Sequence, residues 1–213
     1  MVNLLFDYDG TLHNSIKIYA PAFRTAYAYL VENGFAECKE FTDKEISYWL
    51  GFTPEEMWKC FVPKLPDEEK QKCSAIIGRE MISLVNKGMA ELYPQAEYVL
   101  QKLKDLGYNL IFLSNCKHAY MIEHIRYFRL DRFFSEFYCS EDFGFIPKYE
   151  IFHTIKARYS GDFIVIGDRF HDMEMAEMRH LQSVGCLYGY GDLSELQGAT
   201  FRIERLTDIM EWL

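Results

Sequence analysis

Short apolar runs that alternate with helical patterns constrain the fold of this chain more than any other feature. Such runs, bounded by turn residues, are typical of buried strands in a parallel sheet. Strands that alternate with helices form βαβ units, which place parallel strands side by side. The predicted strands are Val2–Phe6, Tyr108–Leu113, Phe163–Ile166 and Ser183–Leu187, with two further candidates at Phe134–Cys139 and Thr200–Ile203.

Helical patterns fill the intervals between these runs in the second half of the chain. Pro94 is expected to open a helix with apolar positions up to Leu103, and Gly107 is a suitable stop. Further helices are predicted at Lys117–Phe128, Tyr149–Tyr159 and Asp172–Arg179. The predicted fold class is therefore α/β, with a doubly wound, Rossmann-like parallel sheet as its core.

The stretch after the first strand has a different character, because it contains no convincing strand. Apolar positions recur there with helical spacing, and Pro54 and Pro66 lie near expected helix starts. We expect residues 15–88 to form an all-helical cap domain, inserted into a core made of residues 1–14 and 89–213. The periodic segments are Ile18–Val31, Ile46–Leu50, Met57–Val62 and Ile76–Val85.

Composition narrows the range of partners. The formal net charge of −9 disfavours nucleic acids and anionic membrane surfaces, although a bound cation can still create a local site for a small anion.

Cysteine spacing and the lengths of the apolar runs indicate where the protein is located. The six cysteines form no C-x-x-C pair, which favours reduced thiols. No apolar run has the length of a membrane span and no segment resembles a signal peptide, so a cytoplasmic protein is expected. The sequence does not indicate an oligomeric state.

The clearest chemical signal follows the first strand, where Asp7 and Asp9 precede Gly10. Ligands of open α/β sheets bind beyond the carboxyl ends of the strands, which is where these carboxylates are expected. An ordinary Asp-Gly turn is the alternative. A later strand ends in the same way at Asp168, with Asp172 four residues further on. If the two strands are neighbours, the carboxylates converge and require a hard cation such as Mg²⁺; Asp172 is also suited to capping the next helix.

Two less specific signals lie between these segments. Ser114 and Asn115 follow another strand at a predicted helix start, where backbone N–H groups suit an anionic oxygen, but taken alone such residues more commonly cap the helix. Lys148 precedes a predicted helix and, taken alone, is typical of a solvated lysine.

Taken in this order, the four segments resemble the motifs of the haloacid dehalogenase superfamily. The corresponding stretches are Asp7-Tyr-Asp9-Gly-Thr11, Leu113-Ser114-Asn115, Lys148, and Gly167-Asp168-Arg-Phe-His-Asp172. A helical insert after the first motif is similar to that of phosphoglycolate phosphatase-like members. Two positions depart from the usual pattern: Ile146 stands where many relatives have the lysine, so that Lys148 takes its place, and Asn14 stands where an acidic residue is common.

The resemblance implies a magnesium-dependent phosphatase acting on a small phosphorylated metabolite. It assigns Asp7 as the nucleophile that becomes phosphorylated and Asp9 as the general acid and base. It places the metal on Asp7, the backbone carbonyl of Asp9 and Asp168, with Asp172 as a ligand or a support. Ser114, Asn115 and Lys148 are expected to hold the phosphoryl oxygens.

Several alternatives remain at this point. A phosphomutase has the same core motifs, whereas a dehalogenase needs neither Asp9 nor the metal; a binding module without catalysis is a third possibility. Phosphoglycolate, a sugar phosphate and a nucleoside monophosphate are all compatible substrates.

Four residues soon after the first motif are considered as cap contacts to substrate: His13, Lys17, Tyr19 and Arg24. Four later histidines are expected to be structural or exposed: His118, His124, His153 and His180.

Overall fold

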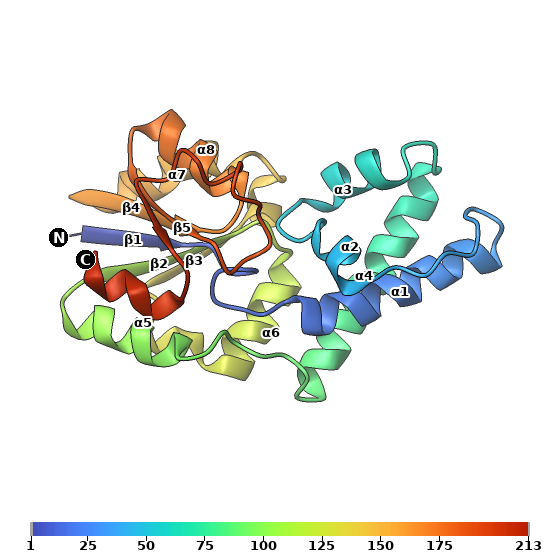
Figure 1. The fold of residues 1–213 in the computed structure, drawn as a ribbon, viewed down its shortest axis with the longest axis horizontal. Helices are drawn as coiled ribbons and strands as arrows, with labels where there is room; N and C mark the ends of the chain where they lie inside the picture. Colours follow the sequence, from blue (N-terminus) through green and yellow to red (C-terminus); the bar gives the residue numbers. More distant parts are fainter. Residues whose placement is uncertain (1, 213) are drawn as a thin grey trace.

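The computed structural model describes residues 2–212 and contains a six-stranded sheet in which every strand is parallel to its neighbours (Figure 1). The strand order is β3-β2-β1-β4-β5-β6. The strands are β1 (Val2–Phe6), β2 (Asn109–Ser114), β3 (Glu136–Cys139), β4 (Asp162–Gly167), β5 (Gln182–Cys186) and β6 (Phe201–Ile203). The predicted fold class is confirmed.

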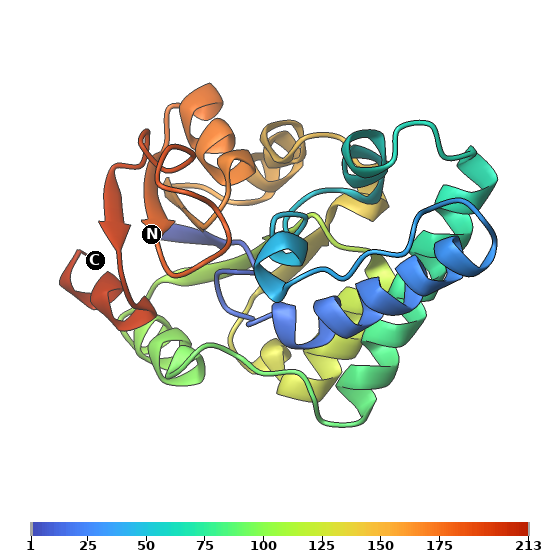
Figure 2. The same cartoon turned by 45° about the vertical axis from the view of Figure 1, so that its right-hand side comes forward.

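Helices cover both faces of this sheet, and four more form a separate unit past the carboxyl ends of the strands (Figures 1 and 2). The helices beside the sheet are α5 (Ala96–Asp105), α6 (His118–Phe128), α7 (Lys148–Arg158) and α8 (Phe170–Arg179), with short 3-10 helices η1 (Leu130–Arg132), η2 (Ser140–Phe143) and η3 (Leu206–Glu211). The helices of the separate unit are α1 (Ile16–Glu32), α2 (Asp43–Ser47), α3 (Pro54–Phe61) and α4 (Asp67–Asn86).

The doubly wound arrangement follows from the alternation of side chains along the central strand β1. Leu4 and Phe6 belong to a buried cluster that includes α5 and α6, whereas Leu5 belongs to a second cluster with α7 and α8. Successive side chains of a strand point to opposite faces, so a wholly apolar strand needs a helical layer on each side. Each fully buried side chain of this kind contributes about 1.5–3 kcal/mol.

Several helix and strand bounds differ from the predicted ones. Helix α5 begins at Ala96 rather than at Pro94, because Gln95 has a positive φ of 64° that is incompatible with a helical turn. Strand β2 runs through Ser114, and α8 begins at Phe170 instead of Asp172. Helix α4 begins at Asp67, directly after Pro66, and is therefore much longer than its predicted segment.

The helical unit lies within the stretch predicted for the cap. Its two long helices, α1 and α4, pack against each other, and α3 begins with a capping box in which Thr53 and Glu56 satisfy each other's backbone N–H groups. The predicted bounds of the cap domain remain a prediction. Among residues 2–212, no helix has both the length and the apolar character that a membrane crossing requires.

Candidate active site

Neighbouring strands bring the predicted site residues to one edge of the sheet. Strand β1 lies between β2 and β4, and the chain leaves these three strands at Asp7, Ser114 and Asp168. All three side chains are buried. Because parallel strands end at the same edge, residues separated by more than 100 positions in sequence meet there.

Three carboxylates form the centre of this site. Oxygen atoms of Asp7, Asp168 and Asp172 all lie within 4.8 Å of one another, and all three residues are buried. Lys148, the first residue of α7, bridges two of them: its Nζ donates to Asp7 Oδ1 at 2.6 Å and to Asp172 Oδ1 at 2.7 Å. The lysine that follows Pro147, two positions after Ile146, thus reaches the carboxylates.

The charges of this cluster do not balance, since one ammonium group faces three carboxylates. Burial raises the pKa of Asp7 well above its usual value, and the charges of Asp172 and Asp168 raise it further, although Lys148 opposes the shift. Burial also raises the pKa of Asp168 to about 7, against a lowering hydrogen bond from the Tyr190 backbone. A cluster of hard oxygen donors with excess negative charge fits a divalent cation such as Mg²⁺.

We expect added Mg²⁺ to raise the melting temperature by roughly 5 °C more at pH 8 than at pH 5. Asp7 and Asp168 have raised pKa values in the folded protein. In their protonated form these two carboxyl groups therefore contribute stability to the folded protein, in full below roughly pH 4, and this contribution is lost as the pH rises toward neutrality. A cation that binds the ionised carboxylates offsets this loss of stability. Thermal unfolding at both pH values measures the effect; an undiminished shift in an Asp168→Asn variant would place the cation elsewhere.

Two glycines, Gly10 and Gly189, leave room for the side chain of Asp168. A Cβ on Gly10, which has a φ of +89°, would lie 2.2 Å from Asp168 Oδ2, and one on Gly189 would lie 2.2 Å from Asp168 Cβ. Thr11 Oγ1 donates to Asp168 Oδ1 at 3.3 Å, and the Tyr190 backbone N–H donates to Oδ2 at 2.7 Å. These two hydrogen bonds fix the orientation of the carboxylate. The close approach of Asp168 to Gly10 explains why a glycine must follow Asp9.

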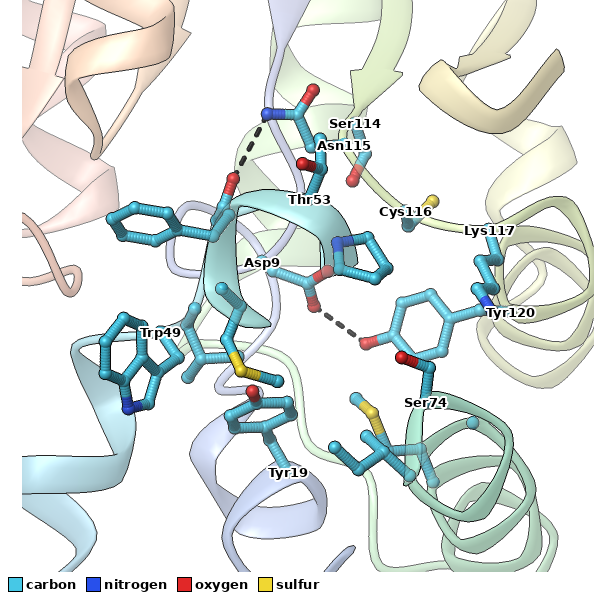
Figure 3. A pocket seen from close by; sticks show the side chains of 18 of the residues that line it. Asp9, Tyr19, Trp49, Thr53, Ser74, Ser114, Asn115, Cys116, Lys117 and Tyr120 are labelled. Carbon is cyan, nitrogen blue, oxygen red and sulfur yellow. Dashed lines mark hydrogen bonds between the residues drawn. The ribbon is translucent and has the colours of Figure 1, made fainter. Parts of the chain in front are cut away.

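Asp9 stands apart from the three clustered carboxylates. Its Oδ1 accepts hydrogen bonds from Ser15 Oγ at 2.6 Å, Tyr120 Oη at 2.7 Å and His13 Nδ1 at 2.9 Å, of which Figure 3 shows the one from Tyr120. Within residues 2–212, no hydrogen bond involves Asp9 Oδ2. One oxygen of this carboxylate is therefore held in place while the other stays available.

The surroundings of Asp9 include a residue that the sequence suggested as a cap contact. His13 is fully buried beside Asp9, and its ring centroid lies 4.6 Å from that of His124. Burial raises the pKa of Asp9, but the hydrogen bonds from His13 and Ser15, together with the charges of His13 and His124, outweigh burial, so the net pKa is lowered. His124 is buried too, with its Nδ1 2.7 Å from the Tyr8 hydroxyl, which gives it the structural role expected of it.

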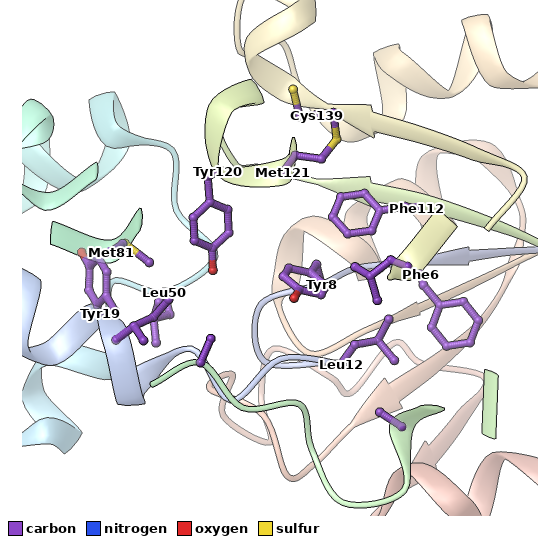
Figure 4. Packing of buried hydrophobic residues seen from close by; sticks show 14 of the residues in the cluster. Phe6, Tyr8, Leu12, Tyr19, Leu50, Met81, Phe112, Tyr120, Met121 and Cys139 are labelled. Carbon is purple, nitrogen blue, oxygen red and sulfur yellow. The ribbon is translucent and has the colours of Figure 1, made fainter. Parts of the chain in front are cut away.

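A cavity of about 370 Å³ lies between the site and the helical unit. Asp7, Asp9, Ser114 and Asn115 line it from the sheet, and Figures 3 and 4 show Tyr120 reaching toward residues of the helical unit. The opposite wall is predominantly apolar and includes Tyr19, Trp49, Leu50, Phe52, Met57, Ile77, Met81 and Ile82.

Only part of the predicted set of cap contacts borders this cavity. Tyr19 does so, whereas Lys17 and Arg24 do not, and Arg24 instead pairs with Asp43 at 2.6 Å. Asn115 uses one amide N–H to bond the backbone carbonyl of Gly51 at 3.1 Å (Figure 3). The contacts of Tyr120 and Ser15 with Asp9 had no signal in the sequence, since neither residue belongs to a recognisable motif.

Comparisons with known proteins show what this chain is similar to along most of its length. The family model described as haloacid dehalogenase-like hydrolase matches residues 4–186. A 5'-nucleotidase of Pseudomonas aeruginosa is 24% identical over 200 residues, covering 92% of this chain and 86% of its own length. A phosphoglycolate phosphatase of Mannheimia succiniciproducens is 22% identical over 202 residues, covering 87% of this chain and 85% of its own.

Solved structures share the fold. A crystal structure of a predicted phosphatase from Clostridium acetobutylicum has a TM-score of 0.84 and 20% identity, covering 99% of this chain and 96% of that one. A predicted phosphoglycolate phosphatase from Haemophilus somnus has a TM-score of 0.82 and 20% identity, with coverage of 99% and 96%.

Proposed function

We propose, since this chain belongs to the haloacid dehalogenase-like hydrolase family, that it is a magnesium-dependent phosphatase of small phosphate monoesters. The observation that carries the proposal is the buried cluster of Asp7, Asp168, Asp172 and Lys148 beside a cavity of about 370 Å³. The two relatives, a 5'-nucleotidase and a phosphoglycolate phosphatase, support phosphate ester hydrolysis. A cytoplasmic location remains a prediction.

Asp7 is the proposed nucleophile. Its Oδ1 is held by Lys148, which leaves the second carboxylate oxygen to attack phosphorus and form an aspartyl-phosphate. Magnesium, when held by Asp7, Asp168 and the Asp9 backbone carbonyl with Asp172 beside them, supplies positive charge to the phosphoryl oxygens. Lys148, Ser114 and the free amide N–H of Asn115 orient those oxygens, which matters because phosphoryl transfer depends mainly on positioning and charge.

Asp9 is the proposed general acid and base. Its lowered pKa means that the carboxylate is ionised in the free protein at neutral pH, which suits the step in which it activates water. The earlier step requires a proton on Asp9 for the leaving oxygen. A phosphate dianion beside Asp9 disfavours its ionised form and so promotes proton uptake when substrate binds. The unbonded Oδ2 is the atom that would carry this proton.

Replacement of Tyr120 by phenylalanine should lower kcat roughly tenfold, because Asp9 Oδ1 loses one of its three hydrogen bonds and its orientation is less restricted. The Mg²⁺-dependent thermal shift should not change, since Tyr120 does not contact the clustered carboxylates. Steady-state kinetics measure the effect. Tyr127→Phe, on the same helix but exposed, is the matched control; equal activity of both variants would remove Tyr120 from the mechanism.

Release of inorganic phosphate from a panel of phosphorylated metabolites, with and without Mg²⁺, tests the proposed function. The panel should contain phosphoglycolate, sugar phosphates, nucleoside monophosphates and an aryl phosphate. Magnesium-dependent release from any of them supports a phosphatase. Transfer of the phosphoryl group within a sugar phosphate, without release, would indicate a phosphomutase instead. Halide release from a haloacid would indicate a dehalogenase, and no turnover of any compound would leave a binding module.

A further inference from the structure

The segment that closes the cavity, which we call the cap loop (residues 48–56), is held by the core at three points. Arg169, Asn115 and His171 each contact it. Each of these residues directly follows or precedes a residue of the proposed site, because their sequence neighbours are Asp168, Ser114 and Asp172. The position of the cap loop is therefore determined by the same segments that position the carboxylates.

Arg169 makes the most extensive of these contacts. Its side chain is almost completely buried, with 2% of its surface exposed. Its Nη1 donates to the backbone carbonyl of Tyr48 at 3.1 Å and also to that of Leu50, while Nε donates to Glu195 Oε2 at 2.9 Å. The guanidinium carbon lies 5.0 Å from the ring centroid of Phe52. A buried guanidinium with one carboxylate partner thus depends on the cap loop for its remaining acceptors.

The cap loop is shaped to receive this side chain. Gly51 has a φ of +88°, and a Cβ at that position would lie 2.8 Å from Arg169 Cγ. The carbonyl of Gly51 accepts the Asn115 amide at 3.1 Å, and His171 Nε2 lies 3.3 Å from Glu56 Oε1 at the start of α3. Trp49, Leu50 and Phe52 of the same loop line the cavity. A displacement of the loop would therefore change the cavity wall opposite Asp7.

We infer that Arg169 is a positioning residue that holds the cap loop over the cavity. Through this contact, the cavity wall beside the leaving group keeps a fixed position relative to the segment that carries Asp168. The kinetic part of this inference rests on the proposed phosphatase function, whereas the structural part does not. If the cap loop moves away, Arg169 loses two carbonyl acceptors and the aromatic face of Phe52 while its charge becomes exposed. The interaction therefore favours the closed loop over any open arrangement.

The test is an Arg169→Gln variant, which keeps a polar side chain but loses the charge and the reach to the two carbonyls. Hydrogen exchange of the amides in residues 48–56 should accelerate at least about tenfold, because two charge-assisted hydrogen bonds are lost. KM for the best monoester of the panel should rise about tenfold or more. Turnover of acetyl phosphate, whose leaving group is too small to need the cap loop, should change less than about twofold.

Arg179→Gln is the matched control. Arg179 is the last residue of α8, the helix that Arg169 directly precedes; it donates from Nε to a backbone carbonyl, that of Tyr149, and packs over an aromatic ring, but it does not contact the cap loop. Its replacement should leave exchange of residues 48–56 unchanged. If Arg169→Gln fails to fold, Arg169→Lys takes its place, because it keeps the charge beside Glu195 but not the forked donors. Hydrogen exchange of residues 48–56 in this variant should be faster than in wild type, but less accelerated than expected for Arg169→Gln.

Unchanged exchange of residues 48–56 in the folded Arg169→Gln or Arg169→Lys protein would overturn the inference. So would an equal loss on acetyl phosphate and on the larger monoester, because that result places Arg169 in the chemistry of Asp168 and not in loop position. A wild-type protein without phosphatase activity would refute the proposed function, and hydrogen exchange would still decide whether Arg169 holds the loop.

Discussion

An Asp7→Asn variant is expected to release no measurable phosphate, with a fall in kcat of about 10⁴-fold or more. The amide of asparagine is a poor nucleophile and carries no charge for a cation. The remaining residues of the site, among them Lys148 and Asp168, stay in place to bind substrate. Loss of turnover with little change in substrate binding is therefore the expected pattern, and steady-state kinetics with a phosphate-release assay measure it.

The same variant should remain folded. Burial and the like charges of Asp172 and Asp168 disfavour the ionised form of Asp7, so a neutral side chain of equal size relieves repulsion in the metal-free protein. Its melting temperature without Mg²⁺ should not fall. Asp105→Asn, on the exposed part of α5, is the control for the substitution itself. Phosphatase activity that survives Asp7→Asn would exclude the covalent mechanism.

Replacement of Lys148 by methionine is expected to affect both activity and stability. Lys148 is the only side-chain cation that pairs with Asp7 and Asp172 within residues 2–212. Its loss should lower kcat/KM about 10²–10³-fold, as removal of a charge-stabilising group in an active site commonly does. Without Mg²⁺, buried carboxylates left without their partner should cost about 3–5 kcal/mol of stability.

This destabilisation has a predictable dependence on conditions. Lys148 lowers the pKa of Asp7, so the variant should raise that pKa further and lose most stability at high pH. Acidic pH, which protonates the carboxylates, and added Mg²⁺ should both restore it. Chemical unfolding at pH 5 and pH 8 measures the difference. Lys156→Met, on the exposed face of the same helix, should behave as wild type; equal unfolding curves for both variants would contradict the proposed charge balance.

The sequence was sufficient to predict that Asp7 and Asp168 lie close together, for a physical reason. Apolar runs identify the strands, and carboxylates that end parallel strands must meet at one edge of the sheet. Asp7 and Asp168 therefore needed only the correct assignment of two strands, both of which are confirmed. Lys148 was recognised from its motif alone, and its contact with Asp7 depends on the position of α7.

The partners of Asp9 and the contacts of the cap loop could not be predicted in this way. Tyr120 reaches Asp9 across 111 positions, and Arg169 reaches Leu50 across 119. The spacing of apolar residues predicts which face of a helix is buried, but it does not predict which polar side chain hydrogen-bonds to which carboxylate. His13 shows the same limit: its place after the first motif suggested a cap contact, yet it lies buried beside Asp9.

A crystal structure of the protein with Mg²⁺ and beryllium fluoride, a mimic of a phosphoryl group on aspartate, tests the central proposal most directly. The expected result is beryllium bound to a carboxylate oxygen of Asp7 and a magnesium ion in contact with Asp7 and Asp168, with Lys148 on a fluoride. Beryllium fluoride absent from Asp7, or a cation bound away from the clustered carboxylates, would contradict the proposed mechanism.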